Sequence, residues 1–189
     1  MFSNTFKVSR LKVAIATVAF GALLVIPAAA SDSEMGVTVT GGSLTNSLST
    51  TEDLPGVNYS FDPQSTSGVL TVGVQDTTGS DNGWTASLTS GDFVSTGDAP
   101  DIAASNLEIT GQGEVTDHSG LNNSGDVSPV DFTTPANIAT ETQIASAAVG
   151  GGAGDFSWDA NMTLNIPAGQ QADTYTGTIT LTTAQQTIE

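Results

Sequence analysis

Residues 156–166 read FSWDANMTLNI, and this stretch decides the fold. Hydrophobic and polar residues alternate along its whole length. The hydrophobic series is Phe156, Trp158, Ala160, Met162, Leu164 and Ile166. Because side chains of a β-strand point alternately to the two faces of a sheet, this period of two predicts a long strand with one buried and one wet face. Such alternation is typical of antiparallel sheets, which keep one face in water.

Shorter stretches repeat the same alternation. They fall at residues 37–40, 70–74, 84–88, 107–109 and 175–181. Turn-forming sequences separate them, at residues 54–56, 62–63, 79–83 and 167–169. Seven or more short strands predict an all-β fold, a two-layer antiparallel β-sandwich with Greek-key, immunoglobulin-like connections. A β-barrel is the alternative.

Two stretches do not show this pattern. Residues 111–137 are rich in Gly, Asn, Ser, Asp and Pro, which predicts a long loop. Residues 138–149 fit a short helix or a strand, and the three glycines at 150–152 end either one. We expect residues 31–189 to form a single domain with its core at about residues 36–184.

The N-terminus has the layout of a secretory signal peptide. Lys7, Arg10 and Lys12 precede an apolar run of 14 residues at 13–26, and a proline and three alanines follow at 27–30. A membrane-spanning helix needs about 20 apolar residues, so the run is short for an anchor. We therefore predict cleavage after Ala30 and a secreted or surface location without a membrane span, with a retained N-terminal anchor as the alternative.

Removal of this segment leaves an unusual charge. All three Lys and Arg residues precede residue 13 and all 20 acidic residues follow residue 30, so the formal net charge changes from −17 to −20. Nucleic acid is excluded as a partner because phosphate binding needs basic side chains. The acidic surface indicates either adaptation to a saline or cation-rich medium or a surface kept soluble by its charge. The chain has no cysteine, so no disulfide stabilises it.

The side chains available for catalysis are few. His118 is the only histidine, it lies in the loop-like stretch, and no G-x-S-x-G motif is present. We expect no enzyme activity, no catalytic residues and no cofactor-binding residues.

Calcium is the one ion that the sequence suggests, and the indication is weak. Asp76, Asp81 and Asn82 fall in one predicted turn, and Asp98 and Asp101 in another. Oxygen ligands on loops suit Ca²⁺, although neither group has EF-hand spacing. Solvated loop carboxylates are the alternative interpretation.

Two segments resemble the WxL-type surface domains of bacteria. In the first, residues 83–88 (GWTASL) are followed by Phe93 and by residues 102–107 (IAASNL). In the second, residues 164–169 (LNIPAG) are followed by residues 175–181 (YTGTITL). The resemblance extends over about residues 68–184 and, more loosely, includes camelysin-like fibre proteins and bundling-pilus subunits. It implies a β-sandwich at the cell surface, and for that family attachment to peptidoglycan.

The sequence therefore predicts a secreted or cell-surface, non-catalytic structural or adhesion module of the WxL-like type, whose partner is a cell-envelope component. The alternative is a self-assembling extracellular fibre or pilus subunit that binds copies of itself. In that case residues 31–40 serve as an N-terminal donor strand, because residues 36–40 are β-prone. We expect Trp84 and Trp158 to be core residues, since each belongs to a strictly alternating series.

Overall fold

The computed structural model describes residues 35–50, 53–121 and 123–187. The chain divides into two compact units, Met1–Thr38 and Val39–Glu189, and every described strand belongs to the second. The predicted signal peptide, residues 1–30, lies outside the described residues. Within them, the helices are single 3-10 turns, and none is long and apolar enough to cross a membrane.

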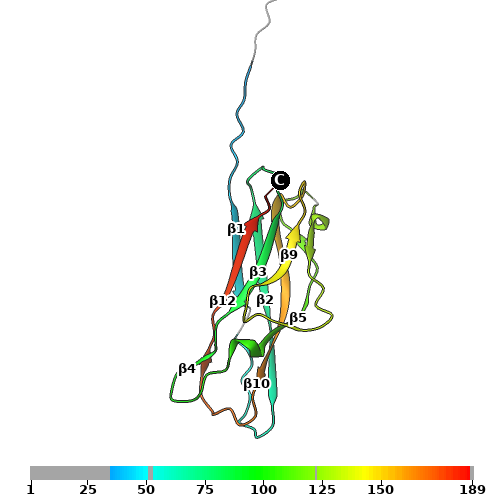
Figure 1. The fold of residues 1–189 in the computed structure, drawn as a ribbon. Coiled ribbons are helices and arrows are strands. Elements are labelled where there is room, and N and C mark those ends of the chain that lie inside the picture. Colours follow the sequence, from blue (N-terminus) through cyan, green and yellow to red (C-terminus); the bar gives the residue numbers. More distant parts are fainter. Residues whose placement is uncertain (1–34, 51–52, 122, 188–189) are drawn as a thin grey trace, which may run out of the picture. The chain divides into compact units, whose positions relative to one another are not determined.

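The second unit consists of antiparallel strands in two main sheets (Figure 1). The first sheet has the order β1 (Leu44–Thr50), β2 (Gln64–Asp76), β10 (Gly154–Ile166), β5 (Leu107–Gln112) and β8 (Ala136–Asn137), and β6 (Thr116–Asp117) also pairs with β10. The second sheet has the order β12 (Ile179–Gln185), β3 (Trp84–Ser90), β9 (Thr142–Ala147) and β7 (Val127–Pro129). A ribbon of β4 (Val94–Ser95) and β11 (Tyr175–Thr176) and two 3-10 turns, η1 (Ala104–Asn106) and η2 (Ser124–Asp126), complete the unit. The prediction of an all-β, antiparallel fold is confirmed.

Strand β10 is the centre of the first sheet. It pairs with β2 in continuous register from Gly154 opposite Asp76 to Ile166 opposite Gln64, and with β5 and β6 on its other side. Its hydrophobic series faces inward from Phe156 to Leu164, as predicted, and each of these side chains is at least 95% buried. The alternating sequence of β10 thus determines which face of the first sheet becomes the core.

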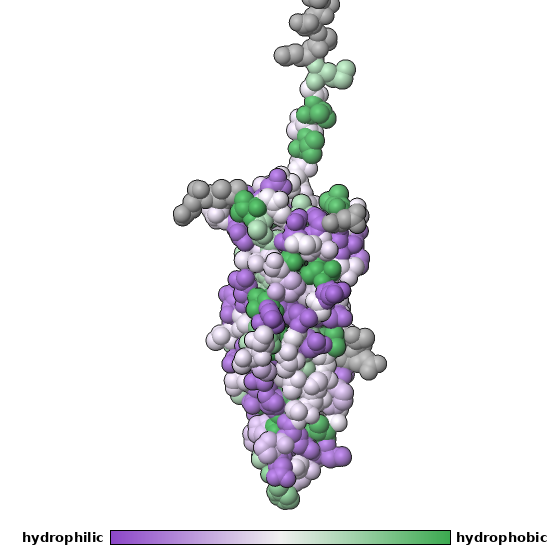
Figure 2. Space-filling model, turned by 90° about the vertical axis from the view of Figure 1, so that its right-hand side faces the viewer, coloured by the Kyte–Doolittle hydropathy of each residue, from purple (hydrophilic) through white to green (hydrophobic). Residues whose placement is uncertain are grey.

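The outward faces of the strands carry mostly Thr, Ser and Asn. On the face shown in Figure 2, hydrophilic residues cover most of the surface and hydrophobic residues are scattered among them. Several outward side chains hydrogen-bond across strands, as Thr71 does to Asp159 (2.8 Å) and Ser67 to Thr163 (2.9 Å). This polarity keeps the wet faces of the sheets compatible with water.

Two tryptophans join the sheets across the core. Trp84 of β3 and Trp158 of β10 are 0% and 2% exposed, and their rings stack with centroids 6.5 Å apart and planes 12° apart. Phe156 packs against the same Trp84 ring at 6.2 Å. The indole N–H of Trp84 donates to the Gly152 carbonyl (2.9 Å). Both tryptophans are core residues, as predicted.

Gln112 closes one side of the core by connecting both sheets. Its side-chain carbonyl accepts the Trp158 indole N–H (2.6 Å), and its amide donates to the carbonyls of Val130 (2.9 Å) and Ile144 (2.7 Å). The Ile144 carbonyl also accepts the Val130 N–H (2.7 Å), so two donors share this oxygen. One amide side chain therefore links the Trp158 indole of the first sheet to Ile144 of β9 and to Val130, which follows β7, in the second.

The structure corrects three details of the sequence prediction. The alternation at residues 37–40 forms no strand, and Val37 and Val39 are each 90% exposed, because the first strand begins only at Leu44. The predicted long loop at 111–137 contains three short strands and a 3-10 turn. Of the two alternatives left open for residues 138–149, the structure shows the strand, β9. The series at residues 175–181 is split between β11 and β12.

The tight contact between Gly152 and Trp84 gives a stability prediction. Gly152 has φ +81°, and an added Cβ would lie 2.4 Å from the Ala147 Cβ and 2.7 Å from the Trp84 indole nitrogen. We expect Gly152→Ala to lower the free energy of unfolding by about 2–4 kcal/mol, from backbone strain plus overpacking. Urea unfolding followed by tryptophan fluorescence measures this.

Gly150→Ala is the matched control. Gly150 has almost the same φ, +84°, and an added Cβ would meet nothing within 4 Å. We expect it to carry the backbone cost alone, about 1–2 kcal/mol. Equal losses for the two variants would show that the packing of Gly152 against Trp84 contributes nothing to stability.

Candidate functional site

The two sheets differ in strand length, and this difference creates a cavity. Strands β2 and β10 are 13 residues long, whereas β3 and β12 have 7 residues and β9 has 6. Where the second sheet ends, loops and the short β4–β11 ribbon cover the inner face of β2 and β10. Loops fill space less completely than a facing sheet, and a cavity of about 570 Å³ remains at this end.

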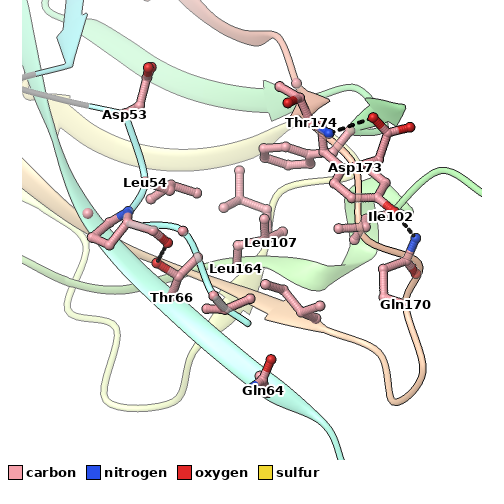
Figure 3. Close-up of a pocket in the computed structure, with 18 of the residues that line it drawn as sticks. Asp53, Leu54, Gln64, Thr66, Ile102, Leu107, Leu164, Gln170, Asp173 and Thr174 are labelled. Atoms are coloured by element: carbon pink, nitrogen blue, oxygen red, sulfur yellow. Dashed lines mark hydrogen bonds between the residues drawn. The ribbon is translucent and has the colours of Figure 1, made fainter. Parts of the chain in front are cut away.

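The floor of this end cavity is part of the hydrophobic core. It is formed by the side chains of Phe93, Ile102, Leu107, Met162 and Leu164, all less than 9% exposed. Figure 3 shows Leu54, Leu107 and Leu164 pointing into the same space from different elements. Leu54 belongs to the segment 53–60, which forms one wall, and residues 170–177 form another.

Hydrogen bonds fix both walls. Thr66 of β2 donates to the Pro55 carbonyl (2.7 Å) and so holds the segment 53–60 against the first sheet. On the other wall, the Gln170 amide donates to the Tyr175 hydroxyl (2.9 Å) and the Pro100 carbonyl (2.5 Å), and that hydroxyl donates to the Gln171 carbonyl (2.5 Å). The cavity therefore has a defined shape, which is usual for small-ligand sites of this volume.

Asp173 connects the rim of the cavity to the loop after β4. Its carboxylate accepts hydrogen bonds from the Ser95 hydroxyl, the Thr174 N–H (2.7 Å), the Thr96 hydroxyl (3.0 Å) and the Gly97 N–H (2.8 Å). These bonds lower the pKa of Asp173 to about 2, and the bond from Ser95 has the largest effect. A lowered folded-state pKa means that these contacts stabilise the fold above pH 4 and are lost only as the pH falls through about 2.

The chemistry of the cavity limits what it can bind. Its floor is apolar, its polar groups are amides and hydroxyls, and its only ionisable acids are Asp53 and Asp173 at the rim. No Lys or Arg occurs after residue 12, so no cationic side chain can balance an anionic ligand. The cavity suits a ligand with exposed apolar groups and a neutral or positive charge.

The calcium candidates lie outside this cavity, in two separate loops. Asp76 is 4% exposed at the end of β2, where it accepts the N–H (2.9 Å) and hydroxyl (2.7 Å) of Thr78; Asp81 and Asn82 follow in the same loop. Asp98 and Asp101 lie in the loop after β4, where Asp101 accepts the Ser95 N–H (2.9 Å). The described part of the chain contains no group of three or more acidic, His or Cys side chains arranged to hold a metal. Calcium binding stays a prediction.

His118 has a partner that the sequence did not reveal. Its Nε2 lies 2.7 Å from the hydroxyl of Ser157, on the outward face of β10. Neither residue lines the end cavity, so the His118–Ser157 pair is not part of that candidate site.

Sequence reasoning recognised the turns of the cavity wall but not the cavity. The Leu-Pro-Gly turn at 54–56 and the Pro-Ala-Gly turn at 167–169 were expected as turns only. Residues of both contribute to the lining of one cavity because β2 and β10 are neighbours, a long-range pairing that no local pattern specifies.

Comparison with known families gives one result. A model of the WxL family, described as a surface cell wall-binding domain, matches residues 27–185. No curated protein matches the chain. The family description concerns binding to the cell wall and includes no enzyme activity.

Thermal melts test the acidic surface and the calcium candidates together. We expect the melting temperature of the exported chain at pH 7 to rise with NaCl, because salt shortens the Debye length from about 30 Å at 0.01 M to about 3 Å at 1 M and screens the carboxylates. If Asp76 and Asp81 bind calcium, millimolar CaCl₂ raises it further than NaCl of equal ionic strength, and Asp81→Asn removes that excess. A melting temperature independent of salt would contradict the role assigned to charge.

Proposed function

Because the chain belongs to the family of WxL surface cell wall-binding domains, we propose that it is an exported, non-catalytic structural or adhesion module held at the cell surface by a cell-envelope component. The observation that carries the proposal is the family match over residues 27–185, which includes every strand of the fold. Export by a cleaved signal peptide and Greek-key, immunoglobulin-like connectivity belong to the same proposal.

The tryptophans do not make the wall contact in this proposal. Trp84 is fully buried and Trp158 nearly so, and both indole N–H groups already have acceptors inside the protein. Neither ring has a face available to a polymer. Their part is to hold the two sheets together so that other residues are presented at the surface.

The exposed aromatic pair Tyr59 and Phe61 is the better contact surface. Phe61 is 83% and Tyr59 54% exposed, and their rings meet edge to face at 5.3 Å, so the pair is rigid. Large exposed aromatic side chains of this kind are enriched where proteins bind partners. An exposed ring can pack against the apolar C–H face of a sugar without any charged group.

Charge determines which component of the envelope is suitable. A chain of net charge −20 after signal removal is repelled by anionic polymers, except where cations bridge them. The proposed partner is therefore an uncharged part of the wall, such as its glycan.

Co-sedimentation with purified cell walls tests this proposal. We expect the exported protein to pellet with walls, and Phe61→Ala to weaken binding at least about fivefold, the change that 1 kcal/mol gives. Because Phe61 is 83% exposed, its loss leaves folding intact. Leu121→Ala, at a residue 66% exposed but outside the aromatic pair, is the control and should bind as the parent does. No wall binding by the parent protein would refute the function, and unchanged binding by Phe61→Ala would refute the surface.

A further inference from the structure

The described residues before β1 form an apolar series without a partner. Met35, Val37 and Val39 are 98%, 90% and 90% exposed, and they alternate with Gly36, Thr38 and Thr40. In an extended chain this spacing places the three apolar side chains on one face. Clustered exposed hydrophobic residues usually mark an interaction site.

The end cavity is apolar and open, and so offers a surface that could cover these exposed side chains. Its apolar floor opens to solvent between two walls, and its rim carries only carboxylates as charged groups. Residues 35–40 (MGVTVT) carry no charge themselves, so the inserted residues add no carboxylate to the cavity floor. The apolar side chains of such a segment suit a floor built from Leu107, Met162 and Leu164.

The cavity of the same molecule is out of reach of this segment. Ser43 and Gly42 are hydrogen-bonded to Thr77, just beyond the end of β2, whereas the cavity lies at Thr66, near the start of β2. Eleven residues of strand separate Thr66 from Thr77, about 36 Å at 3.3 Å per residue. Val37 is six residues from Ser43, and a fully extended chain of that length spans at most about 22 Å.

We propose that residues 35–40 of one molecule insert into the end cavity of a second copy, as an added β-segment with Val37 and Val39 facing its floor. The contact joins different surfaces on the two copies, so each copy binds one neighbour through its segment and another through its cavity, and we expect open head-to-tail chains rather than closed rings. This goes beyond the proposed wall binding, although Tyr59 of the exposed aromatic pair also lines the cavity. Since each copy is strongly acidic, assembly strengthens as NaCl screens their repulsion.

Sedimentation velocity and electron microscopy of the exported protein, at low and high NaCl, test the proposal. The parent protein is expected to form chains that lengthen with protein concentration. Val37→Asp with Val39→Asp places two charges on the apolar face and should lower the association constant at least about tenfold. The control, Thr38→Asp with Thr40→Asp, adds the same charge to the opposite face and should retain assembly. All four residues are exposed, so each variant folds.

A mixing experiment tests the direction of the contact. Val57→Asp changes a cavity-lining residue that is 41% exposed and should abolish assembly from the other side. The two defective variants, each monomeric alone, should form dimers when mixed, because one retains the segment and the other retains the cavity. A parent protein that stays monomeric at high salt and concentration overturns the proposal, as does a mixture without dimers. Loss of wall binding by Val57→Asp with no change in association would assign the cavity to a wall ligand instead.

Discussion

The stacking of Trp84 on Trp158 is the contact on which the two-sheet arrangement depends. Trp84 belongs to β3, an inner strand of the second sheet, and Trp158 belongs to β10, at the centre of the first. The contact therefore joins inner strands of the two sheets rather than their edges. The indole of Trp84 is satisfied by the Gly152 carbonyl and that of Trp158 by Gln112. These two hydrogen bonds restrict which residues fit at positions 152 and 112. A Cβ at 152 or an apolar side chain at 112 would disturb them.

A second constraint is that β2 and β10 continue beyond the strands that face them. Near Trp84 and Trp158 the core is sheet against sheet. Towards Leu164 it is sheet against loop, and there the packing leaves the end cavity. One end of the unit is thus a rigid, closed core and the other an opening with apolar walls.

The sequence predicted what depends on local pattern. The uninterrupted alternation at residues 156–166 correctly predicted β10, its inward face and the burial of Trp158, and that at residues 84–88 the burial of Trp84. It failed at residues 37–40, where the same alternation forms no strand of the sheets, because alternation shows that a segment can pair but not that a partner is present. The end cavity was not predictable, since it depends on the relative lengths of strands that pair across the chain. The same holds for Gln112, whose role requires a carbonyl of β9 and an indole on β10 to meet at one place.

Hydrogen exchange of the two indole N–H groups tests most directly whether the tryptophans form the core contact. Each donates a hydrogen bond inside the protein, and the chain contains no other tryptophan. If the tryptophans form the core contact, both protons exchange only through global unfolding. Their exchange free energies then equal the unfolding free energy from urea titration, with or without cell-wall fragments present. An indole proton that exchanges as fast as that of a free tryptophan side chain, or whose environment changes when wall fragments bind, would contradict it.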